Sequence, residues 1–205
     1  MQVEHPMSSE AFLDDVTSLS RVDWPDVWRG PPGPGPSEFD AWCSRYGWEP
    51  RTVERELTVT TGHGNRITLA SNGHWSPVNA VRFDHAPAEV RTSEAHEKRA
   101  VVERGIAEWK RFGQLVSRVW GSPTWTGRAG DDAFPESPLD GPWRRPKSPS
   151  DNPFRVTFWS PPPGADGPVV LLTLGVPRFT WEADHRAAAL LSLSFHPPAV
   201  GATHG

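Results

Sequence analysis

Cysteine is nearly absent from this sequence, which has a single one, Cys43, among 205 residues. A chain with one cysteine cannot form an intrachain disulfide. Cys43 lies next to Trp42 and on the same helical stripe as Tyr46, so we predict a buried structural thiol. A nucleophilic thiol would need an exposed, electropositive setting and a partner base.

Long apolar runs are also lacking. No stretch approaches the roughly 20 apolar residues that a membrane-spanning helix needs. The opening residues, MQVEHPMSSEAFLDD, have no basic segment followed by an apolar core, so we expect no secretory signal. Together with the single cysteine, these absences predict a cytoplasmic protein that does not associate with a membrane.

The short motifs of common catalytic and cofactor sites are missing as well. We find no G-x-S-x-G elbow, no phosphate-binding P-loop, no G-x-G-x-x-G after a strand and no H-E-x-x-H. Four of the histidines are spaced by eleven residues: His63, His74, His85 and His96. In an antiparallel meander, neighbours in such a series lie at opposite ends of the sheet, nearly 20 Å apart at about 3.3 Å per residue. We therefore predict no metal, no cofactor and no catalytic residue.

Two alternatives stay open in the long loop predicted over residues 121–152. Asp131 and Asp132 are paired carboxylates that, with a histidine, would serve a small hydrolase, although a surface turn is the simpler interpretation. Three basic residues follow Trp143 and suggest a nucleic-acid accessory protein: Arg144, Arg145 and Lys147. Three charges are too few for tight binding on their own, so nucleic acid is not the partner that we expect.

Tryptophan and proline are abundant, with 11 and 23 residues. Many of them fall in DWPDVWRGPPGPGPSEFDAWCSRYGW, residues 23–48. Trp24 and Trp28 flank Pro25 in a segment that we predict to lack regular structure, because proline has no N–H donor. One interpretation is that the two indoles staple the segment onto the body. The other is an exposed binding site for a protein, formed by Asp23, Trp24, Asp26 and Trp28.

Negative charge is concentrated near the N-terminus. Residues 1–40 carry a net charge of −6 and the remainder +2, which gives the total of −4. The segment holds two arginines, Arg21 and Arg29, and eight acids: Glu4, Glu10, Asp14, Asp15, Asp23, Asp26, Glu38 and Asp40. This charge would steer a basic protein partner toward the segment, and a plain solvated acidic surface is the alternative.

The periodicity predicts an α+β fold. A long helix over about 93–120 has an apolar stripe and opposite-charge pairs on its other side. Short helices are expected near Phe12–Leu19 and over 37–46. Strands are expected over 52–61, 65–71 and 77–85, in FRVTFWS and VVLLTLGV as an edge and a central strand, and in LLSLSF. DHRAAALL, residues 184–191, could instead form a short helix.

These elements predict antiparallel strands with the long helix packed across them, in one sheet or in two smaller ones. We expect residues 1–36 to form an acidic segment with a short helix and a Pro/Gly linker. Residues 37–198 are then a single α+β domain.

The order of elements over about 101–176 supplies a resemblance. A long helix, VSRVWGSP, a variable loop, FRVTFWS, a hairpin and VVLLTLGV follow one another. This order resembles uncharacterised actinobacterial proteins of domain-of-unknown-function type, several of which are presumed immunity proteins for polymorphic toxins. The resemblance implies a non-enzymatic protein that binds a partner, and for an immunity protein that partner is the toxin that it neutralises.

Overall fold

A computed structural model describes residues 1–5, 7–33, 35–52, 57–71, 75–128, 131–134, 155–162, 164–176 and 187–198. The helices are α1 (Ser9–Leu19), α2 (Trp24–Arg29), α3 (Pro36–Ser44), the 3-10 turn η1 (Ala95–Glu97) and α4 (Lys98–Trp120). The strands are β1 (Gln2–Glu4), β2 (Glu49–Thr52), β3 (Leu57–Thr60), β4 (Arg66–Ser71), β5 (Val78–Phe83), β6 (Glu89–Thr92), β7 (Trp125–Gly127), β8 (Arg155–Trp159), β9 (Val169–Gly175) and β10 (Ala187–His196).

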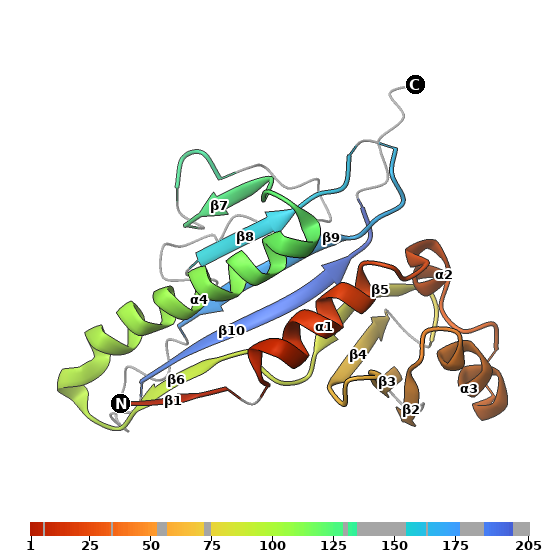
Figure 1. The fold of residues 1–205 in the computed structure, drawn as a ribbon, viewed down its shortest axis with the longest axis horizontal. Coiled ribbons are helices and arrows are strands. Elements are labelled where there is room, and N and C mark those ends of the chain that lie inside the picture. Colours follow the sequence, from red (N-terminus) through yellow and green to blue (C-terminus); the bar gives the residue numbers. More distant parts are fainter. Residues whose placement is uncertain are drawn as a thin grey trace.

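Within these residues, ten strands form a single antiparallel sheet with the order β2-β3-β4-β5-β10-β9-β8-β7 (Figure 1). The long strand β10 joins the two halves of the sheet. On one side most of its length pairs with β9, from Leu190 opposite Gly175 to His196 opposite Val169. On the other side its beginning pairs with β6 and its end pairs with β5. Strand β1 pairs with β6. The predicted α+β class is confirmed. Of the two arrangements left open, the described strands form the single sheet.

Helix α4 packs against β10, β9 and β6, and α1 lies beside it on the same face of the sheet (Figure 1). The closest approach is at Gly105, where an added Cβ would lie 2.6 Å from the Cβ of Ala189. Glycine lets the helix backbone come this close to the strand. The buried stripe therefore passes through Val101, Gly105 and Phe112, and Ile106, which the periodicity placed on the stripe, is only half-buried.

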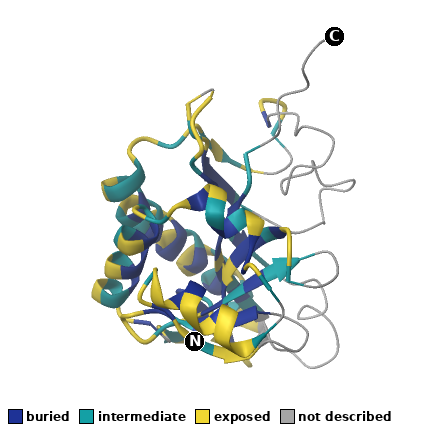
Figure 2. Cartoon of the chain, turned by 90° about the vertical axis from the view of Figure 1, so that its right-hand side faces the viewer, coloured by how far each residue is buried: buried dark blue, intermediate teal, exposed yellow. Residues whose placement is uncertain are grey.

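The N-terminal segment is part of this core. Ser8 caps α1 by accepting a hydrogen bond from the backbone N–H of Ala11. Three apolar side chains of α1 then face the sheet and are fully buried: Phe12, Val16 and Leu19. They belong to one hydrophobic cluster with Phe112 of α4 and with β9 and β10, so residues on both sides of position 36 share a core. Figure 2 shows the exposed residues on the outward turns of the helices.

A second, smaller cluster lies across the sheet. Neighbouring strand residues point to opposite faces, so Leu172 joins the main core whereas Leu171 joins this cluster. Its members are Phe134, Val156, Phe158, Val169 and Leu171, with Trp125 packed against them. The sheet is thus buried on both faces around β8 and β9.

Two predictions of local structure were wrong, and one alternative was not observed. Pro25 lies in the first turn of α2, where a missing N–H costs nothing, so the segment that we expected to be irregular begins with a helix. Strand β8 is not an edge, because β7 pairs with it. Residues 187–190 extend β10 and are not helical, because they pair with β6. Strands β1, β6 and β7 have three or four residues each and show little periodicity.

Among the described residues, no helix is both long enough and apolar enough to cross a membrane.

Candidate functional site

The predicted binding residues come together in α2, but they differ in exposure. Asp23 caps the helix by accepting a hydrogen bond from the backbone N–H of Asp26. Trp24 is only 3% exposed and donates its indole N–H to the carbonyl of Leu19 at 3.1 Å. It stacks between Trp28 and Phe195, with ring centroids 4.8 and 5.2 Å away. For Trp24 the structure therefore favours the staple interpretation, and Trp28 remains half-buried against it.

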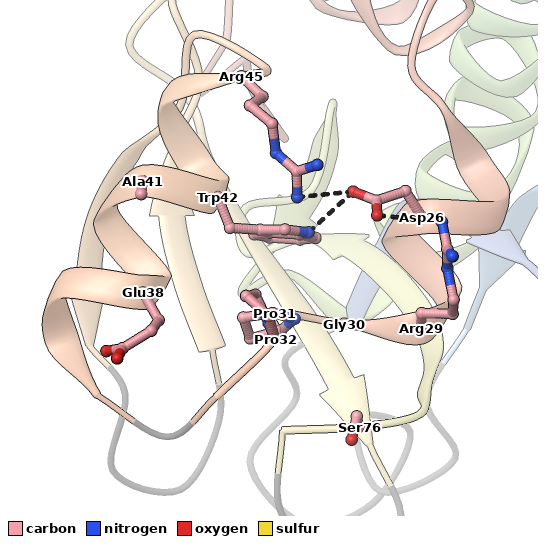
Figure 3. A pocket seen from close by; sticks show the side chains of 10 residues that line it. All are labelled: Asp26, Arg29, Gly30, Pro31, Pro32, Glu38, Ala41, Trp42, Arg45 and Ser76. Atoms are coloured by element: carbon pink, nitrogen blue, oxygen red, sulfur yellow. Dashed lines mark hydrogen bonds and ion pairs between the residues drawn. The ribbon is translucent and has the colours of Figure 1, made fainter.

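Asp26 is the centre of a hydrogen-bonded cluster between α2 and α3 (Figure 3). Its Oδ2 accepts hydrogen bonds from the indole N–H of Trp42 at 3.1 Å and from the hydroxyl of Tyr46. The guanidinium of Arg45 reaches the same oxygen at 2.8 Å, and that of Arg29 reaches Oδ1 at 3.2 Å. Two cations and two neutral donors therefore surround one carboxylate.

Gly30 turns the chain from α2 into the proline-rich connection. Its φ of +78° lies in the left-handed region, which side chains disfavour. An added Cβ would also lie 2.5 Å from the carbonyl oxygen of Trp75. Pro31, which follows, is buried, whereas Pro32 is exposed. The start of the connection thus packs against the loop before β5.

An open pocket of about 670 Å³ lies between these elements. It is lined by Asp26, Arg29, Gly30, Pro31, Pro32, Glu38, Ala41, Trp42, Arg45 and Ser76 (Figure 3). The side chains of Arg29 and Arg45 are 73% and 53% exposed, whereas that of Asp26 is 16% exposed. Glu38 extends from the far side of α3, away from Asp26 (Figure 3). The pocket therefore presents guanidinium donors and proline and alanine walls to solvent.

Two ionisable groups near the pocket, Tyr46 and Cys43, have raised pKa values. Burial, and next the hydrogen bond to Asp26, raises the pKa of Tyr46 well above its usual value. Burial, and next the charge of Asp40, raises the pKa of Cys43 to about 12. Cys43 is 0% exposed, which confirms the predicted buried thiol. Both groups stay protonated at neutral pH, so neither is an activated nucleophile or base.

Of the residues that line this pocket, only Asp26 was among the binding residues predicted from the sequence. Arg29 was counted only as a charge, and Arg45, Pro31 and Ser76 were not considered. Arg45 follows Trp42 by three residues on one helix face, which is a local signal. Trp42 and Arg45 contact Asp26 across 16 and 19 residues of sequence, and no local pattern predicts such contacts.

The carboxylates considered for the hydrolase alternative lie in a turn. Asp131 accepts a hydrogen bond from the backbone N–H of Arg128 at 2.7 Å, and its own N–H donates to the carbonyl of Arg128. Asp132 is exposed. This arrangement is the surface turn that was the simpler interpretation. Trp143, Arg144, Arg145 and Lys147 lie outside the described residues.

The histidine series does not converge where it is described. His63, His85 and His96 are exposed, and His74 lies outside the described residues. In the described part of the chain, no group of three His, Cys, Asp or Glu side chains could hold a metal ion. His63 instead lies 3.2 Å from the hydroxyl of Ser18 in α1.

Asp15 lies one turn before Ser18 and completes a superficially triad-like group. It is fully buried, and burial raises its pKa, although hydrogen bonds from Thr61 and Asn65 act in the opposite direction. Asn65 donates its amide N–H to Asp15 at 2.5 Å. Asp15 thus anchors the 61–65 turn to α1 through its hydrogen bonds to Thr61 and Asn65. We interpret the group as a structural attachment of the turn.

No protein-family model matches the chain, and no curated protein or solved structure is significantly similar to it.

Proposed function

We propose that this chain is a non-enzymatic protein-binding protein that contacts its partner at the α2–α3 pocket. The observation that carries the proposal is the pair of exposed arginines, Arg29 and Arg45, held on either side of Asp26 at an open pocket. Arginine is enriched among the residues that dominate binding energy at protein interfaces. Arginines that are already positioned lose less conformational entropy when a partner binds.

The lining residues support binding in preference to catalysis. They include neither a histidine nor a cysteine. Asp26, which could in principle act as a base, already accepts hydrogen bonds or ion pairs from four side chains. A general base needs an accessible lone pair within hydrogen-bonding distance of the substrate proton.

The charge around the pocket refines the expectation of a basic partner. Asp23 and Asp26, which we expected to attract it, are engaged in the cap of α2 and in the arginine cluster. Acidic side chains that remain exposed on α1 and α3 include Glu10, Asp14 and Asp40. These acids would steer a basic partner toward the surface, and the arginines would then make the close contacts.

The more specific proposal is that the partner is a bacterial toxin and that the chain acts as its immunity protein. It is supported by the resemblance of residues 101–176 to presumed immunity proteins. An immunity protein binds its toxin without chemistry of its own, and a pocket lined by exposed arginines with neither histidine nor cysteine is compatible with that role.

The test measures how the pocket arginines contribute to binding. The full chain captures its partner from lysate of the source cell, and the purified partner is then titrated against the double variant Arg29→Ala/Arg45→Ala. We expect roughly 30-fold weaker binding, which corresponds to the loss of about 2 kcal/mol that is typical of hot-spot residues.

Arg99→Ala is the matched control, because Arg99 is also exposed and pairs with one carboxylate, Glu103 on α4. This variant should bind like the wild type. Equal binding by the double variant and the wild type would contradict the pocket as the contact surface. For the toxin proposal, co-expression with a toxin encoded beside this chain should permit growth with the wild type and not with the double variant.

A further inference from the structure

The two pocket arginines make few hydrogen bonds within the protein. Arg29 contacts Asp26 through one terminal nitrogen, Nη2, and so does Arg45. Within the described residues, the other N–H groups of these two guanidinium groups have no hydrogen-bond partner, although Arg45 also lies over the ring of Tyr46 with 5.7 Å to its centroid. A guanidinium group carries five N–H donors. Most of the donors at this pocket are therefore available to a ligand.

Asp26 cannot satisfy the remaining N–H groups of the two arginines, because both of its oxygens already have partners within the protein. Its two oxygens accept from Trp42, Tyr46, Arg29 and Arg45. The carboxylate is mostly shielded, whereas the guanidinium groups are not. Asp26, Arg29 and Arg45 together carry a net charge of +1, and Glu38, the other acid of the lining, extends away from them (Figure 3).

On these grounds we propose that the partner inserts a carboxylate, the side chain of an Asp or Glu residue, between Arg29 and Arg45. The proposal rests on the proposed binding role of the pocket. Planar carboxylates match the fork of an arginine, which can bind both oxygens at once. Because Asp26 holds both guanidinium groups in place, a second carboxylate would find them already oriented.

The surrounding acids favour a carboxylate over a more highly charged anion. Glu38 is exposed at the rim, and Asp40 is exposed on the same helix. A phosphate group would add up to two negative charges near these side chains, whereas a carboxylate adds one. A carboxylate flanked by lysine or arginine residues fits best, since the flanking cations would lie toward Glu38 and Asp40. This arrangement reconciles a basic partner with an arginine-lined pocket.

The walls of the pocket suit the rest of such a residue. Pro32 and Ala41 are exposed beside the arginines and offer apolar contact to a methylene stem. A volume of about 670 Å³ holds one side chain with a short piece of extended backbone. We infer that the partner presents an acidic residue on a protruding loop.

The experiment titrates the full chain with two blocked tripeptides, alanine–glutamate–alanine and alanine–glutamine–alanine. NMR follows the Nε–H signals of the arginines and the indole N–H of Trp42. The glutamate peptide should cause saturable shifts at Arg29, Arg45 and Trp42. The glutamine peptide has nearly the same shape but lacks the charge and has an NH2 donor in place of one acceptor oxygen, so it should bind about tenfold more weakly or not at all.

The double variant Arg29→Gln/Arg45→Gln removes both charges and should abolish the glutamate-specific shifts. Its indole spectrum reports whether the fold is intact, and the single variants serve if the double variant does not fold. Arg99→Gln is the matched control and should leave the titration unchanged. Inorganic phosphate is titrated in parallel and should bind more weakly than the glutamate peptide.

Several results would overturn the proposal. Equal shifts with both tripeptides would mean that the pocket recognises apolar groups or backbone. Equal shifts at Arg99 and at the pocket arginines would mean diffuse ion pairing, and tighter phosphate binding would mean a different ligand class. If purified partner binding depends on Arg29 and Arg45 but no glutamate-specific response occurs, the carboxylate proposal fails and the binding role stands. If the pocket variants bind the purified partner as tightly as the wild type does, the proposed binding role of the pocket fails as well.

Discussion

Two carboxylates in this protein are each held by two arginines, yet they occupy different environments. Glu108 of α4 is 3% exposed and contacts Arg104 at 2.7 Å and Arg111 at 2.8 Å, with His5 at 3.2 Å. Asp26 is 16% exposed and is held by two arginines that extend into solvent at the rim of a pocket. The chemical groups are similar, and their surroundings differ.

The difference lies in what else the arginines touch. Arg111 donates to Glu108 through Nε and to Ser9 through Nη1, and its guanidinium lies 4.3 Å from the ring centroid of Phe112. This cluster links the start of α1 to α4. Among the residues that the structure describes, the arginines at Asp26 have no comparable second contact apart from that of Arg45 with Tyr46. A buried ion cluster therefore serves folding in one region, and an open one leaves donors for a ligand in the other.

The largest effect is expected from Glu108→Gln, which leaves two arginines and a histidine without their carboxylate. Removing one partner of a buried ion pair costs about 3 to 5 kcal/mol. Because the arginines are partly solvated, we expect the lower end, about 3 kcal/mol, in urea unfolding. Glu103→Gln removes an exposed i,i+4 partner of Arg99 and should cost about 0.5 kcal/mol or less. Similar losses in both variants would mean that Glu108 is not a special contact.

The pH dependence of this loss sharpens the comparison. Burial alone would raise the pKa of Glu108, but hydrogen bonds from His5 and Arg111 and the charges of Arg111 and Arg104 outweigh it and lower the pKa below its usual 4.5. A group with a lowered folded pKa stabilises the protein above its unfolded pKa, and that stability is lost as the pH falls through the folded value.

The difference in unfolding free energy between the wild type and Glu108→Gln should therefore be constant above about pH 4.5 and shrink below it. His196 also responds to acid, because burial, and next the charge of Arg82, lowers its pKa to about 4. This residue is unchanged in both proteins, so its effect cancels in the difference. A difference that grows on acidification would contradict the assignment.

Much of the fold could be predicted from local patterns. The long helix, the main strands and the buried Cys43 follow from periodicity, which reports the face that an element buries. The register of the helix face could not be predicted, because it depends on the close contact of Gly105 with Ala189, 84 residues away. Short strands such as β1 and β6 exist because they pair with each other and with β10.

The candidate site was predicted only in part. The sequence drew attention to the segment of Asp23 to Trp28, and Asp26 is the centre of the pocket cluster. Two interpretations of Trp24 were open, a staple and a partner contact, and its packing between Trp28 and Phe195, a strand residue 171 positions later, fits the staple. Proline signalled irregularity, although a proline in the first helical turn is compatible with α2.

A smaller effect is expected from Asp26→Asn. The substitution removes the charge that holds Arg29 and Arg45 but keeps an acceptor for Trp42 and Tyr46. Because the cluster is partly solvated, we expect a loss of about 1 to 2 kcal/mol in urea unfolding, less than for Glu108→Gln. Asp40→Asn, an exposed acid on α3, should be within about 0.5 kcal/mol of the wild type. A loss larger than that of Glu108→Gln would reverse the comparison of the two clusters.

The smallest effect is expected from Cys43→Ala, which tests whether the buried side of α3 can change without affecting the pocket. Cys43 follows Trp42 on α3 and is fully buried, so its replacement leaves a small cavity that costs about 1 kcal/mol. The guanidinium groups of Arg29 and Arg45 lie on the solvent side of this helix pair, so partner binding and the tripeptide titration should be unchanged.

In the wild type, the thiol should react with a thiol reagent at neutral pH only as fast as the protein unfolds, because its pKa is raised to about 12. Ser44→Ala, on the exposed side of α3, is the control and should alter neither stability nor binding beyond about 0.5 kcal/mol. Rapid labelling of native Cys43 would show that α3 opens while the rest of the protein stays folded. Helix α3 would then be too mobile to hold Arg45 in the orientation that binding requires.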